Sequence, residues 1–569
     1  MNCARCSFEC MHCLASLLEV PADTFPPIAA LLMCRLMSSA CACAVTITHS
    51  KFTGNTADNG GGLYMTDSTR ANITHTTLSD NAAGRNGGGI AANAEARLTV
   101  TSCQGVANQA TTGGFMAITE SARIEVTATN LVANSASAFG GAVYAQNSSR
   151  VIMKDCNITG DGRASNVRGG AINLYDKASA NLTSCHISNI VGQAGAGFMI
   201  SGSSQLQATG CTLQHLTASQ YGGAFMASGT AQVAWVGGSI VNIHAVSGAG
   251  VADVGGNASV TFANTILEDD TADHGGALIV EGSATVSFTG CLFHRCAART
   301  YAGAILVTDR AVVYLVKCTL SNCSAAAEGG AVGAAINGSV YFEHCKLKYN
   351  TATMLGGAIA LTQNARVRAA RTLFFHNTAV AGGGIAAVGG SHVALSQCLL
   401  YGNSATQGGG MALGGNATLR MVSSKVLGNV ATIAGGGLHI EGGNYDMSQI
   451  SSSVHNNKAP LVADVVMIPK KIAVINSSSL DNFVSRLGAD DGILNVTILA
   501  SGQRGVACPG LDVAAAILER GGEVYVLTTQ KTGSDGKVHM RVKLRRPPGV
   551  TATAVVALSC CLLLSKTMV

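Results

Sequence analysis

One short segment of the chain gathers the acidic side chains best suited to chemistry, beside a histidine and 15 residues after a further aspartate. The residues are Glu268, Asp269, Asp270, Asp273 and His274, with Asp253 before them. Carboxylates clustered on one face can hold calcium, or can act as the acid and base that cleave a sugar linkage. The competing hypothesis is a solvated turn in which Asp270 joins the asparagine ladder described below. We favour this structural hypothesis, so the sequence assigns no catalytic, cofactor-binding or metal-binding residue.

Cysteines are the other reactive side chains, and ten of the twenty lie among the repeats described below. Eight occupy one repeat position: Cys103, Cys156, Cys185, Cys211, Cys291, Cys318, Cys345 and Cys398. Other repeats carry Thr76, Thr129, Thr265 or Thr372 there, and a position that accepts both Cys and Thr is typical of a small, tightly packed wall site. Cys296 and Cys323 instead replace an Asn. Free buried thiols are the favoured hypothesis, and disulfides between neighbouring repeats are the alternative.

Two further patterns resemble metal sites only superficially. Cys3-x2-Cys6 and Cys10-x2-Cys13 have the pair spacing of a zinc site, but only three residues separate the two pairs and a zinc domain needs more. Four histidines fall near a common turn in scattered repeats, so we expect surface positions for them. They are His186, His215, His244 and His294.

The elements that must position these side chains are fifteen copies of one repeating unit. A small, mostly Gly-Gly doublet, one further residue and an apolar residue begin at 60, 87, 113, 140, 169, 195, 222, 248, 275, 302, 329, 356, 382, 408 and 435. The starts recur at a nearly constant interval of about 27 residues, and a fixed period of this length indicates stacked, identical units. The apolar residues are Leu63, Ile90, Met116, Val143, Ile172, Phe198, Phe225, Val251, Leu278, Ile305, Val332, Ile359, Ile385, Met411 and Leu438.

Each unit is predicted to form three short strands. The second strand alternates apolar and polar residues, as a strand with one buried face does. Its apolar pairs are Leu98/Val100, Ile124/Val126, Val151/Met153, Val260/Phe262, Val286/Phe288, Val340/Phe342, Val393/Leu395 and Leu419/Met421.

The third strand carries an apolar residue followed three positions later by Asn, whose stacked amides can bond to one another. These pairs are Phe52/Asn55, Leu78/Asn81, Leu131/Asn134, Leu347/Asn350, Phe374/Asn377, Leu400/Asn403, Val426/Asn429 and Val454/Asn457. Asp161 and Asp270 take the Asn position in two more units.

Three strands per unit, without helical periodicity, predict an all-β fold. We expect a parallel β-helix of about 15 coils over residues 45–460, because stacked units of this kind bury a continuous core. A right-handed coil is expected from the usual crossover sense of parallel strands.

The repeat motifs carry a family resemblance. They are clearest in Gly169-Gly170-Ala171-Ile172, Gly356-Gly357-Ala358-Ile359, Phe52-Thr53-Gly54-Asn55 and Phe374-Phe375-His376-Asn377. These GGA[IVL] and FxxN motifs resemble the repeats of chlamydial polymorphic outer membrane proteins, a right-handed β-helix group of the pectin-lyase-like superfamily. The resemblance implies surface display and adhesion. Because the superfamily also contains pectate lyases and polygalacturonases, a polysaccharide lyase or glycoside hydrolase is the alternative function.

The two ends do not repeat. Within residues 1–44, residues 28–44 resemble a hydrophobic signal segment that ends in small residues. Residues 461–549 are expected to form a small β-rich, Ig-like region in which strands at 523–528 and 538–544 flank a hairpin turn at 534–536. Residues 550–569 form an apolar tail, for which a buried strand, a truncated anchor and a membrane helix all stay open.

Composition narrows the function class. A formal net charge of +5 over 569 residues, with no Lys/Arg-rich block, argues against nucleic acid as a partner. Sequons for N-glycosylation fit a secreted protein, and they begin at Asn72, Asn147, Asn157, Asn181, Asn257, Asn322, Asn337, Asn416, Asn476 and Asn495. We therefore expect a non-enzymatic protein, extracellular or at the cell surface (outer membrane included), with membrane association through its termini. Its expected role is adhesion or ligand binding, with glycans or wall components as partners, or else a structural role at the cell surface.

Overall fold

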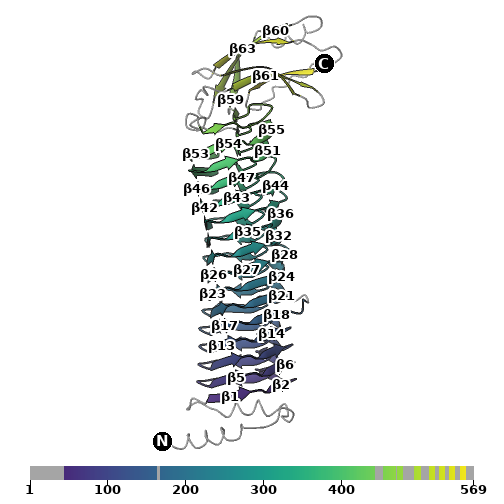
Figure 1. Ribbon diagram of the computed structural model, residues 1–569, viewed down its shortest axis with the longest axis vertical. Coiled ribbons are helices and arrows are strands. Elements are labelled where there is room, and N and C mark those ends of the chain that lie inside the picture. The colour runs from purple at the N-terminus through teal and green to yellow at the C-terminus, as the bar shows by residue number, and fades with distance from the viewer. Residues whose placement is uncertain are drawn as a thin grey trace, which may run out of the picture. The chain divides into compact units, whose positions relative to one another are not determined.

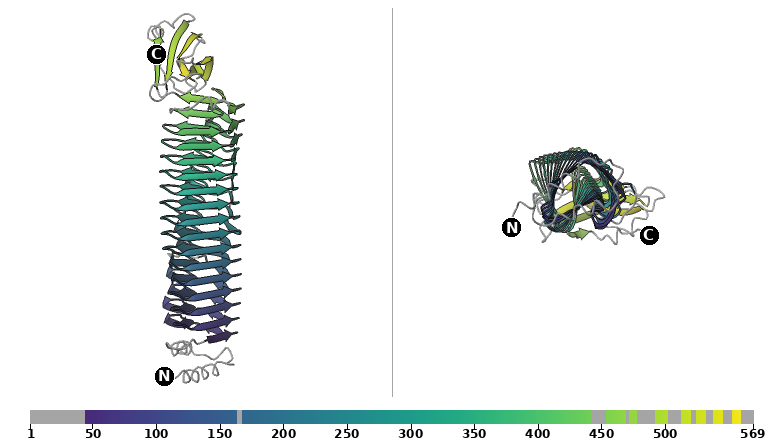
Figure 2. Two further views of the ribbon diagram at one scale, coloured as in Figure 1. Left: turned by 90° about the vertical axis from the view of Figure 1, so that its left-hand side faces the viewer. Right: turned by 90° about the horizontal axis from the view of Figure 1, so that it is seen from below.

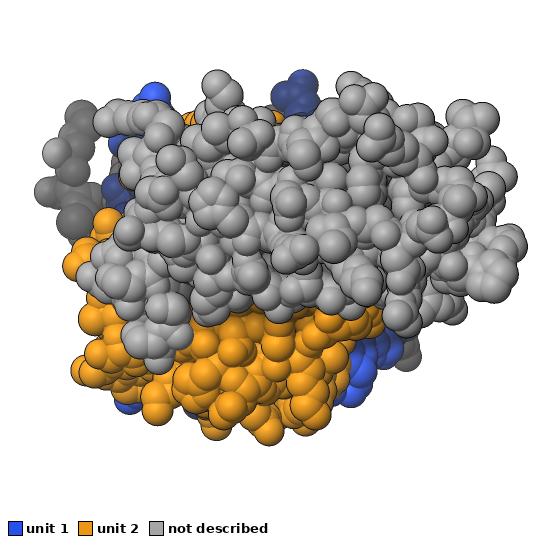
Figure 3. All heavy atoms as spheres, turned by 90° about the horizontal axis from the view of Figure 1, so that it is seen from above, with its two compact units in different colours: residues 1–299, 303–318 blue, residues 300–302, 319–569 orange. Residues whose placement is uncertain are grey.

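The computed structural model describes residues 44–162, 167–441 and 453–468, and six strands between 471 and 558. The N-terminal cysteine pairs and most of the signal-like segment lie outside the described residues. Contacts divide the chain into two larger units, which are distinct from the repeating units of the sequence: unit 1, residues 1–299 and 303–318, and unit 2, residues 300–302 and 319–569, which Figure 3 colours separately. Every regular element in the described residues is a β-strand, as the sequence predicts.

Within each unit, successive coils contribute equivalent strands to parallel sheets (Figures 1 and 2). The first sheet comprises, in unit 1, β4(Leu63–Met65), β8(Ile90–Ala92), β12(Met116–Ile118), β16(Val143–Asn147), β19(Ile172–Asp176), β22(Phe198–Ile200), β25(Phe225–Ala227), β29(Ala252–Val254), β33(Leu278–Val280) and β37(Ile305–Val307). In unit 2 it comprises β41(Val332–Ala334), β45(Ile359–Leu361), β48(Ile385–Ala387), β52(Met411–Gly414), β56(Leu438–Glu441) and β58(Val465–Ile468).

The second sheet contains the longer, alternating strands. In unit 1 these are β1(Ala44–Thr48), β5(Arg70–Thr74), β9(Arg97–Thr101), β13(Arg123–Thr127), β17(Arg150–Lys154), β20(Ser179–Thr183), β23(Gln205–Thr209), β26(Gln232–Val236), β30(Ser259–Ala263), β34(Thr285–Thr289) and β38(Val312–Val316). In unit 2 they are β42(Ser339–Glu343), β46(Arg366–Ala370), β49(His392–Ser396) and β53(Thr418–Val422).

The third sheet precedes the asparagine corner. Its unit 1 strands are β2(Lys51–Thr53), β6(Thr77–Ser79), β10(Gln104–Val106), β14(Asn130–Val132), β18(Asn157–Thr159), β21(His186–Ala194), β24(Thr212–Tyr221), β27(Ser239–Val241), β31(Ile266–Glu268) and β35(Leu292–His294). Its unit 2 strands are β39(Thr319–Ser321), β43(Lys346–Lys348), β47(Leu373–Phe375), β50(Leu399–Tyr401), β54(Lys425–Leu427) and β57(Val454–His455).

Short strands also follow the asparagine corner in many coils. They are β3(Thr56–Asn59), β7(Ala82–Asn86), β11(Gln109–Thr112), β15(Ser135–Phe139), β28(His244–Ala245), β32(Thr271–His274), β36(Ala297–Tyr301), β40(Ser324–Ala325), β44(Thr351–Ala352), β51(Ser404–Gln407) and β55(Val430–Ala434).

The register confirms that residues one repeat apart lie beside each other. In unit 1, Leu98 pairs with Ile124, and in unit 2, Ile359 pairs with Ile385. The predicted inward residues of the first two sheets are buried apart from Leu419, which is half-buried. Aromatic rings continue the stacking inside the core, where the Phe262 and Phe288 ring centroids lie 5.0 Å apart.

One predicted core position is wrong by a single residue. Phe225 pairs with Ala252, and Ala252 in turn pairs with Leu278, so Val251 does not belong to that column. The doublet of this coil is therefore Ala249-Gly250 rather than Gly248-Ala249. Val251 is still fully buried, which explains why an apolar pattern alone could not fix the register.

Two glycines at one corner serve different needs. Gly356 has φ of +64°, in the left-handed region that side chains rarely adopt. Gly357 has an ordinary φ, but a Cβ there would collide with backbone atoms of Gly383 and Thr378 in the next coil. The doublet thus combines a backbone bend with close approach of successive coils.

The asparagine ladder is buried and hydrogen-bonded in both units. Asn377 is typical: its Oδ1 accepts from the Asn350 N–H at 3.0 Å and Nδ2 at 2.9 Å, and its Nδ2 donates to Asn403 Oδ1 at 2.9 Å and Leu347 O at 3.0 Å. The unit 2 ladder ends on Asp464, whose Oδ1 accepts from Asn457.

Several ladder positions differ from the prediction. Asn108 belongs to the ladder, but the pattern missed it because Gly105 stands where an apolar residue was required; the Phe115 ring fills that space. Asp161 is exposed rather than buried in the ladder. Asp270 is buried there as predicted, and its Oδ1 accepts from the Ile243 N–H at 3.1 Å.

Six strands beyond residue 470 form two antiparallel sheets, β59(Lys471–Ser477)–β60(Gly492–Ser501)–β63(Lys537–Leu544) and β62(Val524–Lys531)–β61(Asp512–Glu519)–β64(Ala552–Leu558). The predicted hairpin is wrong, because β62 pairs with β61 and β63 with β60, so consecutive strands belong to different sheets. Part of the apolar tail is the strand β64, which pairs with β61. Among the described residues, no helix is long and apolar enough to cross a membrane.

Removing one ladder amide should be costly. We expect Asn377→Ala to lower the free energy of unfolding by about 3–5 kcal/mol, because buried partners in two neighbouring coils lose their hydrogen bonds together. Chemical denaturation measures this. The matched control is Asn130→Ala, which removes an exposed Asn–Asn hydrogen bond and should cost below about 0.5 kcal/mol. Equal losses in the two variants would contradict the ladder's role.

Candidate functional site

The acidic segment is a set of ion pairs rather than a cluster of free carboxylates. Arg295, one coil further on, binds Asp269 in a bidentate manner, with Nε–Oδ1 at 2.6 Å and Nη2–Oδ2 at 2.7 Å, and reaches Glu268 Oε1 at 2.8 Å. The side chain of Arg299 pairs with Asp273 at 2.8 Å. Hydrogen bonds from Arg295 hold the pKa of Asp269 below its usual value. The segment therefore presents neutralised carboxylates at its surface.

Asp253 is separate from this group and has a different environment. It lies in the middle of β29 on the outward row of the first sheet, between Met226 and Ile279 of the adjacent coils. Its Oδ2 accepts from the Ala249 N–H at 3.2 Å. Burial raises the pKa of Asp253 to about 7, although the Ala249 and Gly222 N–H groups act in the opposite direction. This carboxyl group therefore titrates near neutral pH.

The cysteine position is a second structural ladder. All ten described cysteines are buried and unbridged, so the free-thiol hypothesis is confirmed for them. The Cys345 N–H donates to Thr372 Oγ1 at 3.4 Å, and the Cys398 N–H donates to Ser424 Oγ at 3.0 Å. Burial raises the pKa of Cys103 and of Cys398, which keeps these thiols protonated and weakly reactive.

The four histidines do not converge on one another. His186 lies 3.0 Å from the Gln214 amide and His244 lies 2.9 Å from the Thr271 hydroxyl, in each case across neighbouring coils. Within the part of the chain that the structure describes, no group of three or more His, Cys, Asp or Glu side chains could hold a metal ion.

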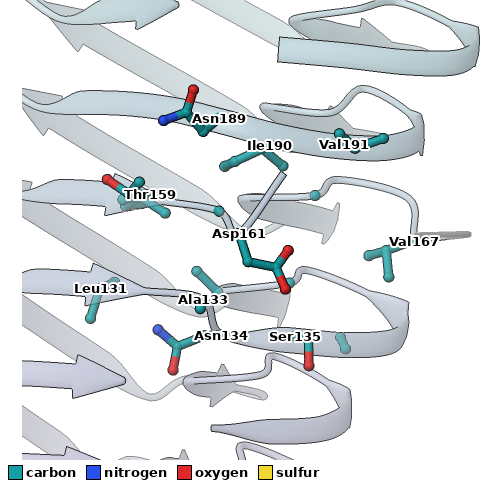
Figure 4. A pocket seen from close by; sticks show the side chains of 16 residues that line it. Leu131, Ala133, Asn134, Ser135, Thr159, Asp161, Val167, Asn189, Ile190 and Val191 are labelled. Carbon is teal, nitrogen blue, oxygen red and sulfur yellow. The ribbon is translucent and has the colours of Figure 1, made fainter. Parts of the chain in front are cut away.

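A cavity of about 60 Å³ lies in the wall of unit 1, and Figure 4 shows side chains that line it. It lies in the coil between the doublets at 140 and 169, which is the longest interval between successive doublets, and Asn134, Asp161 and Ile190 are among the residues that line it. This volume is far below the roughly 300 Å³ of a small-molecule site, so the cavity has no evident ligand.

The most distinctive surface of unit 1 is the outward face of its second sheet. Arg70, Arg97, Arg123 and Arg150 pair in direct succession at the start of β5, β9, β13 and β17, strands that lie one above another in Figure 1. All four are exposed. We call these four residues the arginine column.

The rest of that face is mostly polar, Ile152 excepted, and is also aligned by the register. A column near the strand ends consists of Thr48, Thr74, Thr101 and Thr127, followed by Lys154, Thr183 and Thr209. Between the two columns lie Asn72, Thr99, Glu125 and Ile152.

The arginine column is unusual because four positive charges, unpaired within the described coils, lie in direct register. Among the described residues, none of the four guanidinium groups takes part in an ion pair, whereas Arg295, Arg299 and Arg371 do. Like charges stacked one strand spacing apart repel by up to about 0.9 kcal/mol per pair in water. Sequence inspection missed the column because its members are a full repeat apart in the chain; aligning the second strands coil by coil reveals it.

Comparison with known proteins supports the fold. The model of the right-handed β-helix region family matches residues 34–163, 110–267 and 275–459, so the chain belongs to this family. Neither the curated proteins nor the solved structures provide a match. The family contains both enzymes and proteins without enzymatic activity, so membership alone does not distinguish them.

Asp253 makes stability depend on pH in a defined direction. Its folded pKa of about 7 exceeds the unfolded value of 3.8, so between these limits the folded state holds a proton that the unfolded state has lost. The contribution of Asp253 to stability is therefore complete below about pH 4 and is lost as the pH rises through 7.

The Asp253→Asn variant lacks this titration and should gain stability relative to the wild type between about pH 4.5 and about pH 8. We expect a relative gain on the order of 1–2 kcal/mol, because solvent reaches the partly buried carboxyl group. Thermal unfolding at a series of pH values measures the difference. Parallel pH profiles for the two proteins would rule out the raised pKa.

Proposed function

We propose that this chain is a non-enzymatic β-helix protein that acts outside the cell or at its surface and binds carbohydrate through a lateral face. The observation that carries the proposal is the second-sheet face of unit 1, where exposed polar and charged side chains recur at one strand spacing in straight columns. Such spacing suits a ligand that is itself extended and repetitive. The resemblance to polymorphic outer membrane proteins supports a surface role in adhesion.

The enzyme alternative has one specific observation in its favour. Asp253, with its raised pKa of about 7, has the proton affinity of a general acid at neutral pH. Against it, the carboxylates of Glu268, Asp269 and Asp273 are paired with arginines. Under the binding proposal, the protein leaves pectin and alginate intact. Conversion that Asp253→Asn or Asp269→Asn abolishes would favour a lyase or hydrolase instead.

A glycan array tests the binding proposal directly. We expect the purified protein to bind a restricted set of glycans. Glycans of the same polymer class should give similar binding signals. The thermally unfolded protein is the control for nonspecific adsorption. Silence across all glycan classes would contradict the proposal.

A further inference from the structure

We propose that the arginine column, Arg70, Arg97, Arg123 and Arg150, is a binding site for a linear polysaccharide that carries anionic groups, either carboxylates or sulfate esters. This inference rests on the carbohydrate-binding function proposed above and adds the site and the charge of the ligand. Its basis is the direct pairing of the four residues in successive coils of unit 1.

The column has the geometry of a one-dimensional anion-binding site. Its four members span three strand spacings, about 14 Å, and each lies at the same point of its strand. Each guanidinium group can form a bidentate pair with a carboxylate or sulfate. Because one coil spacing is close to the length of one sugar ring in an extended chain, successive arginines can face successive sugars.

The column ends sharply within the sheet. In the coil before the column, the same strand position is occupied by Ala44. In the three coils after the column it is occupied by Ser179, Gln205 and Gln232. Within unit 1, positive charge at this strand position is therefore confined to four neighbouring coils. Since like charges in register destabilise a sheet, a ligand that neutralises them provides a reason for this arrangement.

The other charged groups near the column limit its attraction to polyanions in general. Glu125 lies two residues after Arg123 on the same face, and Lys154 lies at the end of β17. Asp67, Glu95 and Glu120 occupy the turns just before the column. None of these carboxylates forms an ion pair with the column among the described residues. The site should therefore depend on short-range contacts more than on net charge.

A polysaccharide fits this face better than a nucleic acid does. The neighbouring middle positions are Asn72, Thr99, Glu125 and Ile152, so amide and hydroxyl groups are available for sugar hydroxyls. Single-stranded nucleic acids need aromatic side chains on which bases stack. From β5 to β17, the arginine column, the middle positions and the column of residues near the strand ends contain no aromatic residue.

The test compares two variants of the full chain that each lose four positive charges. The column variant carries Arg70→Ser, Arg97→Ser, Arg123→Ser and Arg150→Ser, since Ser179 already fills this position in the next coil. The control variant carries Arg310→Ser, Arg366→Ser, Arg368→Ser and Arg420→Ser, all exposed. A second column variant with Gln at the four positions guards against misfolding, and circular dichroism verifies all three.

Binding is measured to polygalacturonate, dextran sulfate, uncharged dextran and a single-stranded oligonucleotide. We expect the wild type to bind polygalacturonate, dextran sulfate or both, with a preference over the oligonucleotide. The column variants should bind about tenfold or more weakly and with a smaller salt dependence, whereas the control should lose less than about threefold.

Four outcomes would overturn the inference: an equal loss in column and control variants, no loss in the column variants, no binding to either anionic polysaccharide, or a preference for the oligonucleotide. The glycan array distinguishes its failure from that of the proposed function. Binding confined to neutral glycans would leave the proposed function intact and remove only the anionic site, whereas silence across the array would remove both.

Discussion

Parallel backbone hydrogen bonding between successive coils is the constraint on which the rest of the structure depends. It sets each side chain beside its counterpart one repeat earlier, for example Ile359 beside Ile385 and Arg97 beside Arg123. Repetition therefore stabilises a side chain that can form a hydrogen bond with an identical side chain in the next coil. It destabilises the fold where identical side chains repel one another. Asn is the best example of the first case, since each amide can both accept from and donate to the next.

The same constraint separates structural chemistry from surface chemistry in this chain. Inside the wall, the Asn and Cys/Thr/Ser ladders use repetition to satisfy buried polar groups. Outside, Arg295 and Arg299 neutralise acidic residues one coil earlier, which uses the register to form ion pairs between coils. The arginine column follows neither pattern, because its repetition places like charges together. That contrast is why we assign a ligand-binding role to the column and not to the acidic segment.

Much of this architecture could be predicted from the sequence because the repeat is regular. The doublets predicted the corner, the apolar columns predicted the core, and Asn377 and its neighbours predicted the ladder. The errors have local physical causes. Val251 and Ala252 are both small enough to be buried and apolar, so only the backbone pairing distinguishes them. Asn108 was missed because Phe115, at the corner directly before β12, fills the space beside Gly105.

The surface was harder to predict than the core because its ion pairs and charged columns are formed by residues that are far apart in the sequence. Arg295 and Asp269 are one repeat apart in the chain, and so are Arg97 and Arg123, so no local window shows either relationship. Both follow once the coil register is applied to charged residues as well as to apolar ones. The consecutive strands β62 and β63 were assigned to one hairpin because turn residues separate them, but their partners lie elsewhere in the sequence.

The most direct test of the account is a set of distances between spin labels on the outward middle position of the second sheet in unit 1. Labels would be introduced through a genetically encoded ketone amino acid, so that labelling is independent of the twenty native cysteines. From Thr99 the register leads in three coils to Asn181 and in six to Thr261. The account predicts Cα separations of about 14 Å and about 29 Å, increasing by one strand spacing per coil. Separations that do not increase in proportion to the number of coils would contradict it.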